Sequence, residues 1–502
     1  MELRADLRSI LQYLPLVAQS SSLVWPPSVE EELQTISRGP SESMVNSGEA
    51  LALHITNMRK SLSLNASDLA PYALQGYGLF FDKKISREES ANFFGEVVPA
   101  LCRLLLQLPS MLEKHYQKAD HVLDGVKSGL RLLGPQEAGI VLLSQELIAA
   151  LLACSFFCLF PEVDRSLKNL QGINFSGLFS FPYMRHCTKQ ENKIKCLIHY
   201  FGRICRWMPT GFVSFERKIL PLEYHPHFVS YPKADSWANS VTPLCSIEIH
   251  TSGAIEDQPC EALEVDFADE YFGGLTLSYD TLQEEIRFSG YTGYGPSFQY
   301  AGDYTDNKDL DIFRRRKTRV IAIDAMPDPG MGQYKLDALI REVNKAFSGY
   351  MHQCKYNIDV KHDPEASSST KIKFVFAKQH VPLTSDSASQ VIESSHRWCI
   401  DHEEKKIGVA TGNWGCGVFG GDPELKIMLQ WLAISQSGRP FMSYYTFGLQ
   451  ALQNLNQVIE MVALQEMTVG DLWKKLVEYS SERLSRRTWL GFFSWLMTSL
   501  ST

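Results

Sequence analysis

Hydrophobic residues recur at intervals of three and four positions through much of the N-terminal half of the chain, from about Phe94 to Trp207. The clearest run holds Val97, Leu101, Leu104, Leu105 and Leu108. Side chains at this spacing return to one face of an α-helix, which can then pack on a core. The pattern therefore predicts an all-helical N-terminal domain over residues 1–207.

Two strongly apolar stretches are expected to lie in the core. The first extends from Leu147 to Phe160, after Glu146 and before Pro161, and is shorter than the roughly 18 residues of a membrane-spanning helix. It is interpreted as a buried helix, and no membrane association is expected. The second is an aromatic cluster near the C-terminus, for which a partner or membrane surface is the alternative. Its members are Trp489, Phe492, Phe493, Trp495 and Leu496.

After about Thr210 the pattern changes to short runs rich in β-branched and aromatic residues, which is typical of strands. The expected strands are Gly211–Phe215, Cys245–His250, Leu263–Phe267, Arg319–Ile323, Ile407–Ala410 and Pro440–Phe447. Helical patterns follow or separate the later strands, at Lys335–Tyr350, Pro423–Ser435 and Leu449–Leu464. This alternation predicts an α/β domain over residues 208–502, with a largely buried sheet flanked by helices. The polar stretch at about 362–406 is expected to be a long, mobile loop.

Composition narrows the class of protein. The chain has 502 residues, of which 44% are hydrophobic and 21% charged, as in ordinary globular proteins. Its net charge of -8 argues against a general nucleic-acid-binding surface, so no direct DNA binding is expected. The eleven cysteines are dispersed, without a C-x-x-C pair. They fit reduced thiols in the nucleus or cytoplasm better than disulfides or a zinc site, and no secretory signal is expected.

Glycines crowd a segment that follows one expected strand and precedes an expected helix. They are Gly412, Gly415, Gly417, Gly420 and Gly421, with Asn413 and Trp414 among them. Such a turn lets backbone N–H groups approach a phosphate, and the start of the next helix adds a favourable dipole. Asp422 is the expected N-cap of that helix and Pro423 its first residue. The segment is predicted to bind a diphosphate; a tight turn that binds nothing is the alternative.

The same segment matches the Gly-x-Gly-x-x-Gly pattern of dinucleotide-binding folds. That pattern expects an acidic residue about twenty positions further on, at the end of the next strand. The next strand ends instead in Tyr445-Thr446-Phe447. A redox role for NAD is therefore disfavoured, whereas an ADP-ribose group, which shares the diphosphate, stays compatible.

Acidic residues gather in a second segment. Asp266 and Asp269 lie at the end of an expected strand, and Gly273-Gly274 and then Gln283-Glu284-Glu285 follow. Cleavage of a glycosidic bond needs a carboxylic acid that protonates the leaving oxygen and a carboxylate that activates water or stabilises the oxocarbenium-like centre. Adjacent glutamates on a helix point about 100° apart, so the two are expected to act differently. Taken alone, such a pair is more often solvated surface.

The order of several motifs resembles that in poly(ADP-ribose) glycohydrolase, most of all its plant branch, over most of the chain. The motifs are Val265-Asp266-Phe267-Ala268, Gln283-Glu284-Glu285-Ile286-Arg287-Phe288, Tyr291-Thr292-Gly293-Tyr294 and Gly412-Asn413-Trp414-Gly415-Cys416-Gly417. The resemblance implies a macrodomain-like mixed sheet after the helical domain. It also implies an exo-acting hydrolase that cleaves ribose-ribose O-glycosidic bonds and releases ADP-ribose. The implied partners are poly(ADP-ribose) and ADP-ribosylated proteins, with no metal and no organic cofactor.

The resemblance also implies roles for individual residues. Glu285 would be the general acid and then the general base, Glu284 would hold ribose hydroxyls, and Asp266 would support the catalytic loop. Residues implied in substrate binding are Ile255, Glu256 and Gln283 on the adenine and ribose side, Asn413, Gly415, Gly417, Phe419 and Gly420 at the diphosphate, and Asp269, Tyr294 and Phe447. For the aromatic residues Tyr294 and Phe447, packing in the core is the alternative.

Three features depart from the family pattern. Asp269 stands where the family usually has Asn, so an acceptor replaces an amide donor. Leu275 follows Gly273-Gly274 where a third glycine is usual, and its side chain could obstruct the approach to the diphosphate. The connection between Phe288 and Ser289 is shorter than usual. The last two features favour an alternative function, a catalytically weakened macrodomain that binds poly(ADP-ribose) without cutting it, whereas the glutamate pair favours catalysis.

Overall fold

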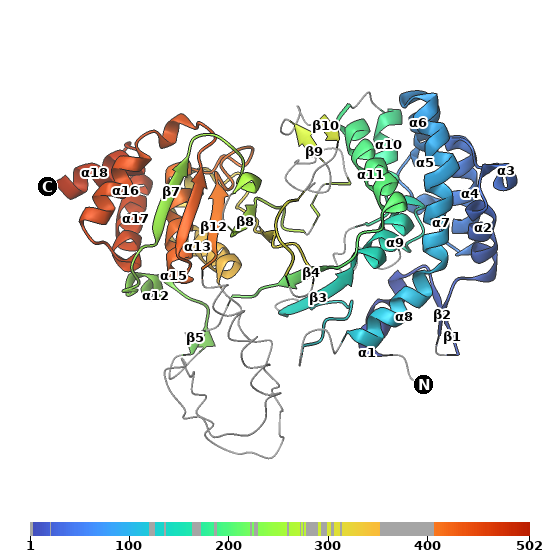
Figure 1. Ribbon diagram of the computed structural model, residues 1–502. Helices are drawn as coiled ribbons and strands as arrows, with labels where there is room; N and C mark the ends of the chain where they lie inside the picture. The colour runs from blue at the N-terminus through green and yellow to red at the C-terminus, as the bar shows by residue number, and fades with distance from the viewer. Residues whose placement is uncertain are drawn as a thin grey trace, which may run out of the picture.

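The computed structural model shows two lobes side by side, a helical lobe that carries the N-terminus and a lobe built on a parallel sheet that carries the C-terminus (Figure 1). The structure describes residues 4–20, 22–119, 126–134, 137–162, 172–184, 188–220, 223–224, 229–258, 261–271, 273–274, 276–277, 290–292, 299–302, 306–311, 314–351 and 406–501. The predicted loop at about 362–406 lies outside these residues, except for Lys406.

The helical lobe is held by one large apolar core. Its helices are α1 (Ala5–Ile10), α2 (Pro27–Ser37), α3 (Pro40–Ser43), α4 (Gly48–Ser61), α5 (Ala73–Leu79), α6 (Arg87–Asn92), α7 (Val98–Leu106), α8 (Leu108–Lys118), α9 (Gln145–Phe156), α10 (Ser176–Met184) and α11 (Thr188–Arg206). Ser144 caps α9 by accepting a hydrogen bond from the Leu147 N–H group, and most of this helix is buried. The prediction of a core helix there is confirmed. Within the described chain no single helix is long and apolar enough to cross a membrane; only the bent pair Arg87–Leu106 and Leu108–Lys118 reaches that length when taken together.

The predicted helical domain is confirmed, and two short strand pairs lie among its helices. A hairpin joins β1 (Val17–Gln19) to β2 (Ser22–Val24), and β3 (Gly139–Ser144) pairs antiparallel with β4 (Phe212–Arg217). The apolar run in β3 is too short for its period to separate strand from helix. Its partner strand lies about seventy positions further along the chain, so pairing was not visible in the local pattern.

The second lobe is built on five parallel strands in the order β11-β8-β12-β13-β7. They are β7 (Ser246–His250), β8 (Ala262–Asp266), β11 (Arg319–Ala322), β12 (Gly408–Gly412) and β13 (Phe441–Tyr445). The central strand β12 is buried along its whole length, whereas the edge strands β7 and β11 are half-buried, as expected for a sheet covered by helices. The α/β fold class is confirmed. All five of the described strands in this sheet are parallel.

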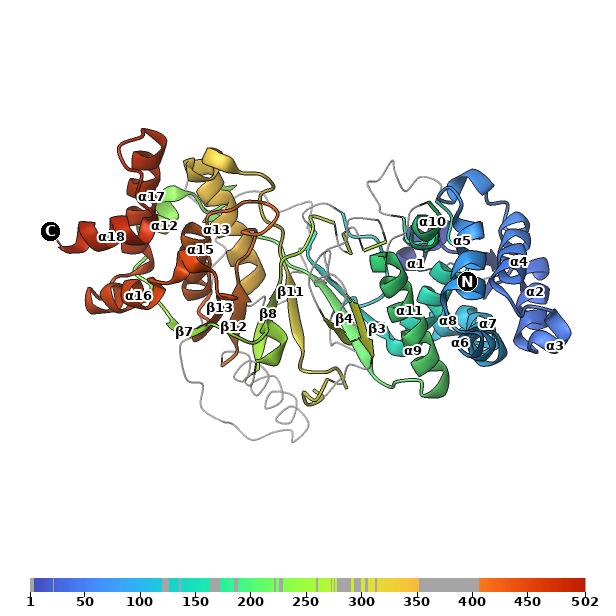
Figure 2. The same cartoon turned by 90° about the horizontal axis from the view of Figure 1, so that it is seen from above.

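Helices cover this sheet and extend the lobe on the side away from the helical lobe (Figure 2). They are α12 (Ala234–Ala238), α13 (Leu336–Tyr350), α15 (Pro423–Gln436), α16 (Leu455–Leu464), α17 (Val469–Leu484) and α18 (Phe492–Ser501). Helices α13 and α15 pack against each other and against the sheet, and α17 and α18 pack on α15. Helix α16 begins later than predicted, because Gln450–Leu452 form a separate 3-10 turn.

The aromatic cluster at the C-terminus docks onto the lobe, as predicted. Phe492, Phe493, Trp495 and Leu496 are buried in the same core as the sheet and α17. The Tyr479 hydroxyl donates to the Leu490 carbonyl at 3.0 Å and ties α17 to the segment before α18. Trp489 does not follow the prediction, because it is 76% exposed.

Candidate active site

The described candidates from the sequence lie on loops at one edge of the sheet. All five strands are parallel, so their carboxyl ends meet at the same edge, where α/β folds commonly bind ligands. Residues after β7 (Ile255, Glu256), at and after β8 (Asp266, Asp269), after β12 (Asn413, Gly415, Gly417, Phe419, Gly420) and after β13 (Phe447) are therefore brought together. The candidates Gln283, Glu284, Glu285 and Tyr294, and also Leu275, lie outside the described residues.

The loop after β12 is tied to the next strand by the amide of Asn413. Its Nδ2 donates to the Thr446 carbonyl at 3.0 Å, and its Oδ1 accepts from the Tyr444 hydroxyl at 3.1 Å. Both ends of the amide are thus engaged within the protein. Asn413 therefore fixes the loop against β13, and the expected place of this residue at the diphosphate stays a prediction.

Two kinds of glycine occur in this loop. Gly415 has φ +70°, and a Cβ atom there would lie 2.5 Å from the Ala325 Cβ; at Gly421 it would lie 2.7 Å from the Gly415 carbonyl oxygen. Protein packing alone therefore requires these two glycines. Gly417 has no positive φ, and open space surrounds the position of its Cβ. Packing does not explain a glycine there, which favours close approach of a ligand over a turn that binds nothing.

Backbone donors line the open side of the loop. The N–H groups of Gly417, Val418 and Phe419 donate to no acceptor within the described part of the chain. The loop leads directly into α15, as predicted: Asp422 caps the helix by accepting from the N–H groups of Glu424 and Leu425, and Pro423 is its first residue. Consecutive backbone donors in a glycine-containing loop form a site for an anionic group such as a phosphate.

A buried ion pair lies beneath the loop, and the sequence analysis missed it. Lys426, on the first turns of α15, is 2% exposed and contacts the carboxylate of Glu342, on α13. Its ammonium group also lies 4.1 Å from the centre of the Trp414 ring, a cation–π distance. The indole of Trp414 in turn donates to the Ile323 carbonyl at 3.2 Å. A lone lysine within the apolar stretch that opens α15 was the only signal in the sequence.

The ion pair is part of a wider charged network. Arg341 contacts both Glu342 and Asp324, and Lys345 pairs with Asp324 at 2.6 Å. The neighbouring Lys345 and Arg341 cations hold the pKa of the Asp324 carboxyl below its ordinary value, although burial opposes them. Burial, together with the nearby Arg341 cation, lowers the pKa of Lys426 to about 7, so this side chain is only partly charged at neutral pH. It lies close to the glycines, because a Cβ atom on Gly415 would be 3.3 Å from its Nζ.

The loop after β8 begins at Asp266, the last residue of the strand, whose carbonyl accepts from the Ile323 N–H group at 3.2 Å. Asp269 accepts from the Tyr271 N–H group at 2.9 Å, a turn contact that an Asn side chain could make as well. The presence of Asp where the family usually has Asn therefore preserves the local turn. Gly273 and Gly274 both have positive φ, of 86° and 43°, and so occupy backbone conformations that favour glycine.

The remaining described candidates differ in exposure. Ile255 is buried in a small cluster with Ala262, Ala410 and Tyr445, so most of its surface serves packing. Phe447 is 44% exposed and has φ 49°, and its ring lies over Gly412, where a Cβ atom would come within 2.9 Å of it. Phe447 is therefore outside the core, which removes the alternative of ordinary core packing for this residue.

Titratable groups near the loop are shifted by burial. Burial raises the pKa of the Cys416 thiol to about 12, so this cysteine stays protonated at neutral pH and is a poor nucleophile. Burial also raises the pKa of Glu424 to about 6, although its carboxylate accepts from the Phe493 N–H group at 2.6 Å. Among the described residues, no group of three or more His, Cys, Asp or Glu side chains is arranged to hold a metal ion.

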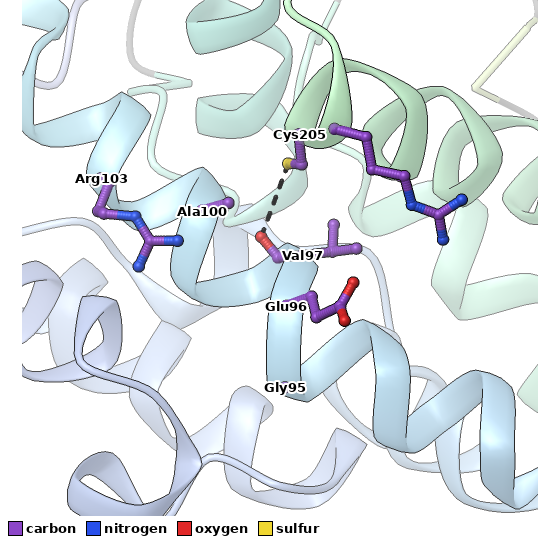
Figure 3. A pocket seen from close by; sticks show the side chains of 8 residues that line it. Gly95, Glu96, Val97, Ala100, Arg103 and Cys205 are labelled. Carbon is purple, nitrogen blue, oxygen red and sulfur yellow. Dashed lines mark hydrogen bonds between the residues drawn. The ribbon is translucent and has the colours of Figure 1, made fainter.

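A separate pocket of about 290 Å³ lies in the helical lobe, between the segment that leads into α7 and the end of α11 (Figure 3). Glu96, Arg103 and Arg206 line it, and the Cys205 thiol donates to the Val97 carbonyl beside it. Arg103 also donates to the Ser37 carbonyl at 2.7 Å. None of the predicted site residues lines this pocket, so the candidate site remains the edge of the sheet.

Two family models match the chain. The model described as "Poly (ADP-ribose) glycohydrolase (PARG), helical domain" matches residues 85–217. The model described as "Poly (ADP-ribose) glycohydrolase (PARG), Macro domain fold" matches in two parts, residues 234–289 and 287–454. The two parts meet where the sequence analysis placed a shortened connection.

Similar proteins extend over the whole chain. "Probable poly(ADP-ribose) glycohydrolase 2" of Arabidopsis thaliana is 92% identical over 532 aligned residues, 30 more than the 502 of this chain, with both chains fully covered. "Poly(ADP-ribose) glycohydrolase 1" of the same plant is 47% identical over 556 residues, covering 100% of this chain and 98% of that protein. A Caenorhabditis elegans protein, "Poly(ADP-ribose) glycohydrolase 1", is 26% identical over 69% of this chain and 41% of its own length.

Proposed function

The chain belongs to the poly(ADP-ribose) glycohydrolase family and is a glycosidase that hydrolyses poly(ADP-ribose), and from this premise we propose that it cleaves ribose-ribose O-glycosidic bonds and releases ADP-ribose. The observation that supports the substrate most directly is the loop after β12. Its amides that donate to no described acceptor, the open space at Gly417 and the buried Lys426 beneath it make a site for a diphosphate at the edge of the sheet.

The chemistry is proposed to lie with the two adjacent glutamates. Glu285 donates a proton to the leaving ribose oxygen and then takes one from the attacking water, as a general acid and base. Glu284 holds the ribose hydroxyls next to the bond that breaks, and Asp266, at the end of β8, supports the loop that leads to them. The division follows the resemblance to the family, since both glutamates lie outside the described residues.

The remaining proposed contacts place the substrate along the sheet edge. Gly415, Gly417, Phe419 and Gly420 present the loop after β12 to the diphosphate, while Asn413 fixes that loop. Glu256 and Gln283 lie on the adenine and ribose side with Ile255, which contributes mainly packing. Phe447, exposed beside Gly412, and Tyr294 offer rings that pack on the ligand, and Asp269 orders the turn after β8.

The wider setting is also a proposal. The enzyme acts on polymer attached to ADP-ribosylated proteins, in the nucleus or the cytoplasm, in the response to DNA damage. Neither a metal nor an organic cofactor takes part, and neither DNA nor a membrane is bound directly. The net charge of -8 supports the proposal that DNA is not bound directly. The dispersed cysteines support a place in the nucleus or the cytoplasm.

The test of the chemistry is Glu285→Gln, which keeps the shape of the side chain and removes the transferable proton. We expect turnover of poly(ADP-ribose) to fall by about 100-fold or more, while calorimetric affinity for ADP-ribose is largely preserved. Glu460→Gln, on the exposed side of α16, is the matched control and should behave as the wild type. Wild-type turnover by the Glu285 variant would show that this residue is not the acid and base.

A further inference from the structure

In the sequence, the catalytic glutamates lie between two described pieces of chain. Thr276 and Leu277 precede them, and β9 (Gly290–Thr292) with its partner β10 (Gln299–Gly302) follows them. Both pieces contact the helical lobe: β9 and β10 lie beside α10 and α11 (Figure 1), and α11 packs on β10. The described residues on both sides of the glutamates thus contact the helical lobe.

The piece before the glutamates is held by a charged side chain and by a close backbone approach. Lys193, on α11, is 3% exposed, and its ammonium group donates to the Thr276 carbonyl at 3.3 Å. Leu277 packs against the apolar core of the helical lobe. Its carbonyl oxygen lies so near α10 that a Cβ atom on Gly177 would come within 2.8 Å of it.

The piece after the glutamates meets the same helix. The Tyr300 N–H group donates to Asn192 Oδ1 at 3.4 Å, and the ring of Tyr300 lies 5.3 Å from that of His199. Asn192 is adjacent to Lys193 in the sequence of α11. One helix of the helical lobe therefore contacts both sides of the catalytic segment.

We propose that α10 and α11 hold the catalytic segment in register with the sheet, and that Lys193 and Gly177 are positioning residues for the hydrolysis. Lys193 acts through the backbone of Thr276, and Gly177 acts by permitting the approach of Leu277. The inference rests on the proposed function, because it assigns these residues to the geometry of that reaction.

The first test removes the charge of Lys193. Lys193→Met keeps the aliphatic stem that packs in the core but loses the donor to Thr276, whereas Lys193→Arg retains a donor. We expect kcat of the Lys193→Met variant to fall by about 100-fold, as for a misplaced catalytic group, with partial recovery in the Lys193→Arg variant. Lys195→Met is the matched control, because Lys195 acts on Glu89 of α6 and should leave kcat unchanged.

The second test crowds the backbone contact. Gly177→Ala raises helix propensity in α10, so any loss of activity cannot come from a weaker helix. The added Cβ must displace Leu277, and kcat should again fall by about 100-fold. Gly202→Ala, also inside a helix but with open space at its Cβ, is the control and should keep full activity.

Three measurements on the full chain decide the matter. For Lys193→Met and Gly177→Ala, kcat should fall about tenfold more than calorimetric affinity for ADP-ribose, melting temperature should hold, and hydrogen exchange should rise at 276–277 and 290–302. If kcat is unchanged in both variants, the inference is overturned. The proposed function still stands in that case, because the wild-type chain turns over the polymer. Parallel loss of affinity, stability and kcat also overturns it, because it marks a purely structural role. Absence of turnover in the wild type would instead contradict the proposed function.

Discussion

Two glycine-containing loops leave the same edge of one sheet, and they are supported in different ways. The loop after β12 is braced from within its own lobe, by Asn413, by the capped start of α15 and by Lys426 paired with Glu342. The loop after β8 rests on the other lobe, through Thr276 and Leu277.

Because the two loops are supported by different parts of the molecule, we expect substrate binding and bond cleavage to depend on different contacts. A diphosphate site built inside one lobe keeps its shape whatever the other lobe does. A catalytic segment anchored to a second lobe has the right geometry only when the two lobes are correctly docked. We therefore expect substitutions beneath the loop after β12 to lower stability and ADP-ribose affinity together. Substitutions on α10 and α11 should lower turnover more than ADP-ribose affinity and leave stability unchanged.

The largest effect is expected from Lys426→Met, which leaves Glu342 buried without its nearest cation. Stability should fall by about 3 kcal/mol, the low end for a broken buried ion pair, because Arg341 still contacts Glu342. ADP-ribose affinity should fall as well, most of all below pH 7, because Lys426, whose pKa is about 7, is then mainly charged and the substitution removes a positive charge beneath the loop. Chemical denaturation and calorimetry measure the two quantities.

A double variant sharpens this prediction. Lys426→Met combined with Glu342→Gln removes both charges of the pair, so it should recover part of the lost stability but not the affinity. If Lys426→Met alone unfolds at the wild-type denaturant concentration, the ion pair does not support the loop.

A smaller loss is expected from Gly415→Ala. An alanine at φ +70° is strained, and its Cβ would collide with that of Ala325, so stability should fall by about 2 kcal/mol with a weaker site for ADP-ribose. Thermal unfolding with and without ADP-ribose would measure both. A variant with wild-type melting would show that the loop relaxes easily and is not braced as the structure indicates.

Gly417→Ala separates ligand approach from protein packing. Because the space at its Cβ is open and its φ is not positive, stability should stay unchanged. If a diphosphate lies against this glycine, affinity for ADP-ribose should fall by about tenfold, which corresponds to about 1.4 kcal/mol. Calorimetric affinity equal to that of the wild type would show that the ligand does not lie against Gly417.

The smallest effect is expected in the pH dependence of stability, through Glu424, which links α15 to α18. The pKa of Glu424 is about 6 in the folded chain, above its ordinary value of 4.5, so between these values the folded state holds a proton that the unfolded chain has lost. The stability gained from this proton is present below about pH 4.5 and is lost as the pH rises through about 6. Glu424→Gln should flatten the dependence of melting temperature on pH in this window, relative to Glu460→Gln. Equal slopes in the two variants would contradict the assignment.

The sequence predicted those features of the fold that depend on contacts between residues close together in the chain. The start of α15 follows from Asp422 and Pro423, and the strands that precede Asp269 and Phe447 follow from short apolar runs. Contacts between distant positions were not predictable. Lys426 meets Glu342 across 84 positions, and β3 meets β4 across about seventy.

The role of Asn413 shows the same limit. Its place beside the glycines suggested a position at the diphosphate, but not that its amide also binds Thr446 and Tyr444, which lie more than thirty positions away. Likewise, no periodicity links Lys193 to Thr276, so the support of the catalytic segment by the helical lobe was visible only in three dimensions.

The most direct test of the central claim is a time course of purified wild-type chain with purified poly(ADP-ribose), in which released ADP-ribose is quantified by mass and polymer length is followed on a gel. We predict that ADP-ribose accumulates with time as the polymer shortens, and that Glu285→Gln stops both. A chain that retains the polymer but releases no ADP-ribose and leaves its length distribution unchanged would be a binding protein, and that result would contradict the account.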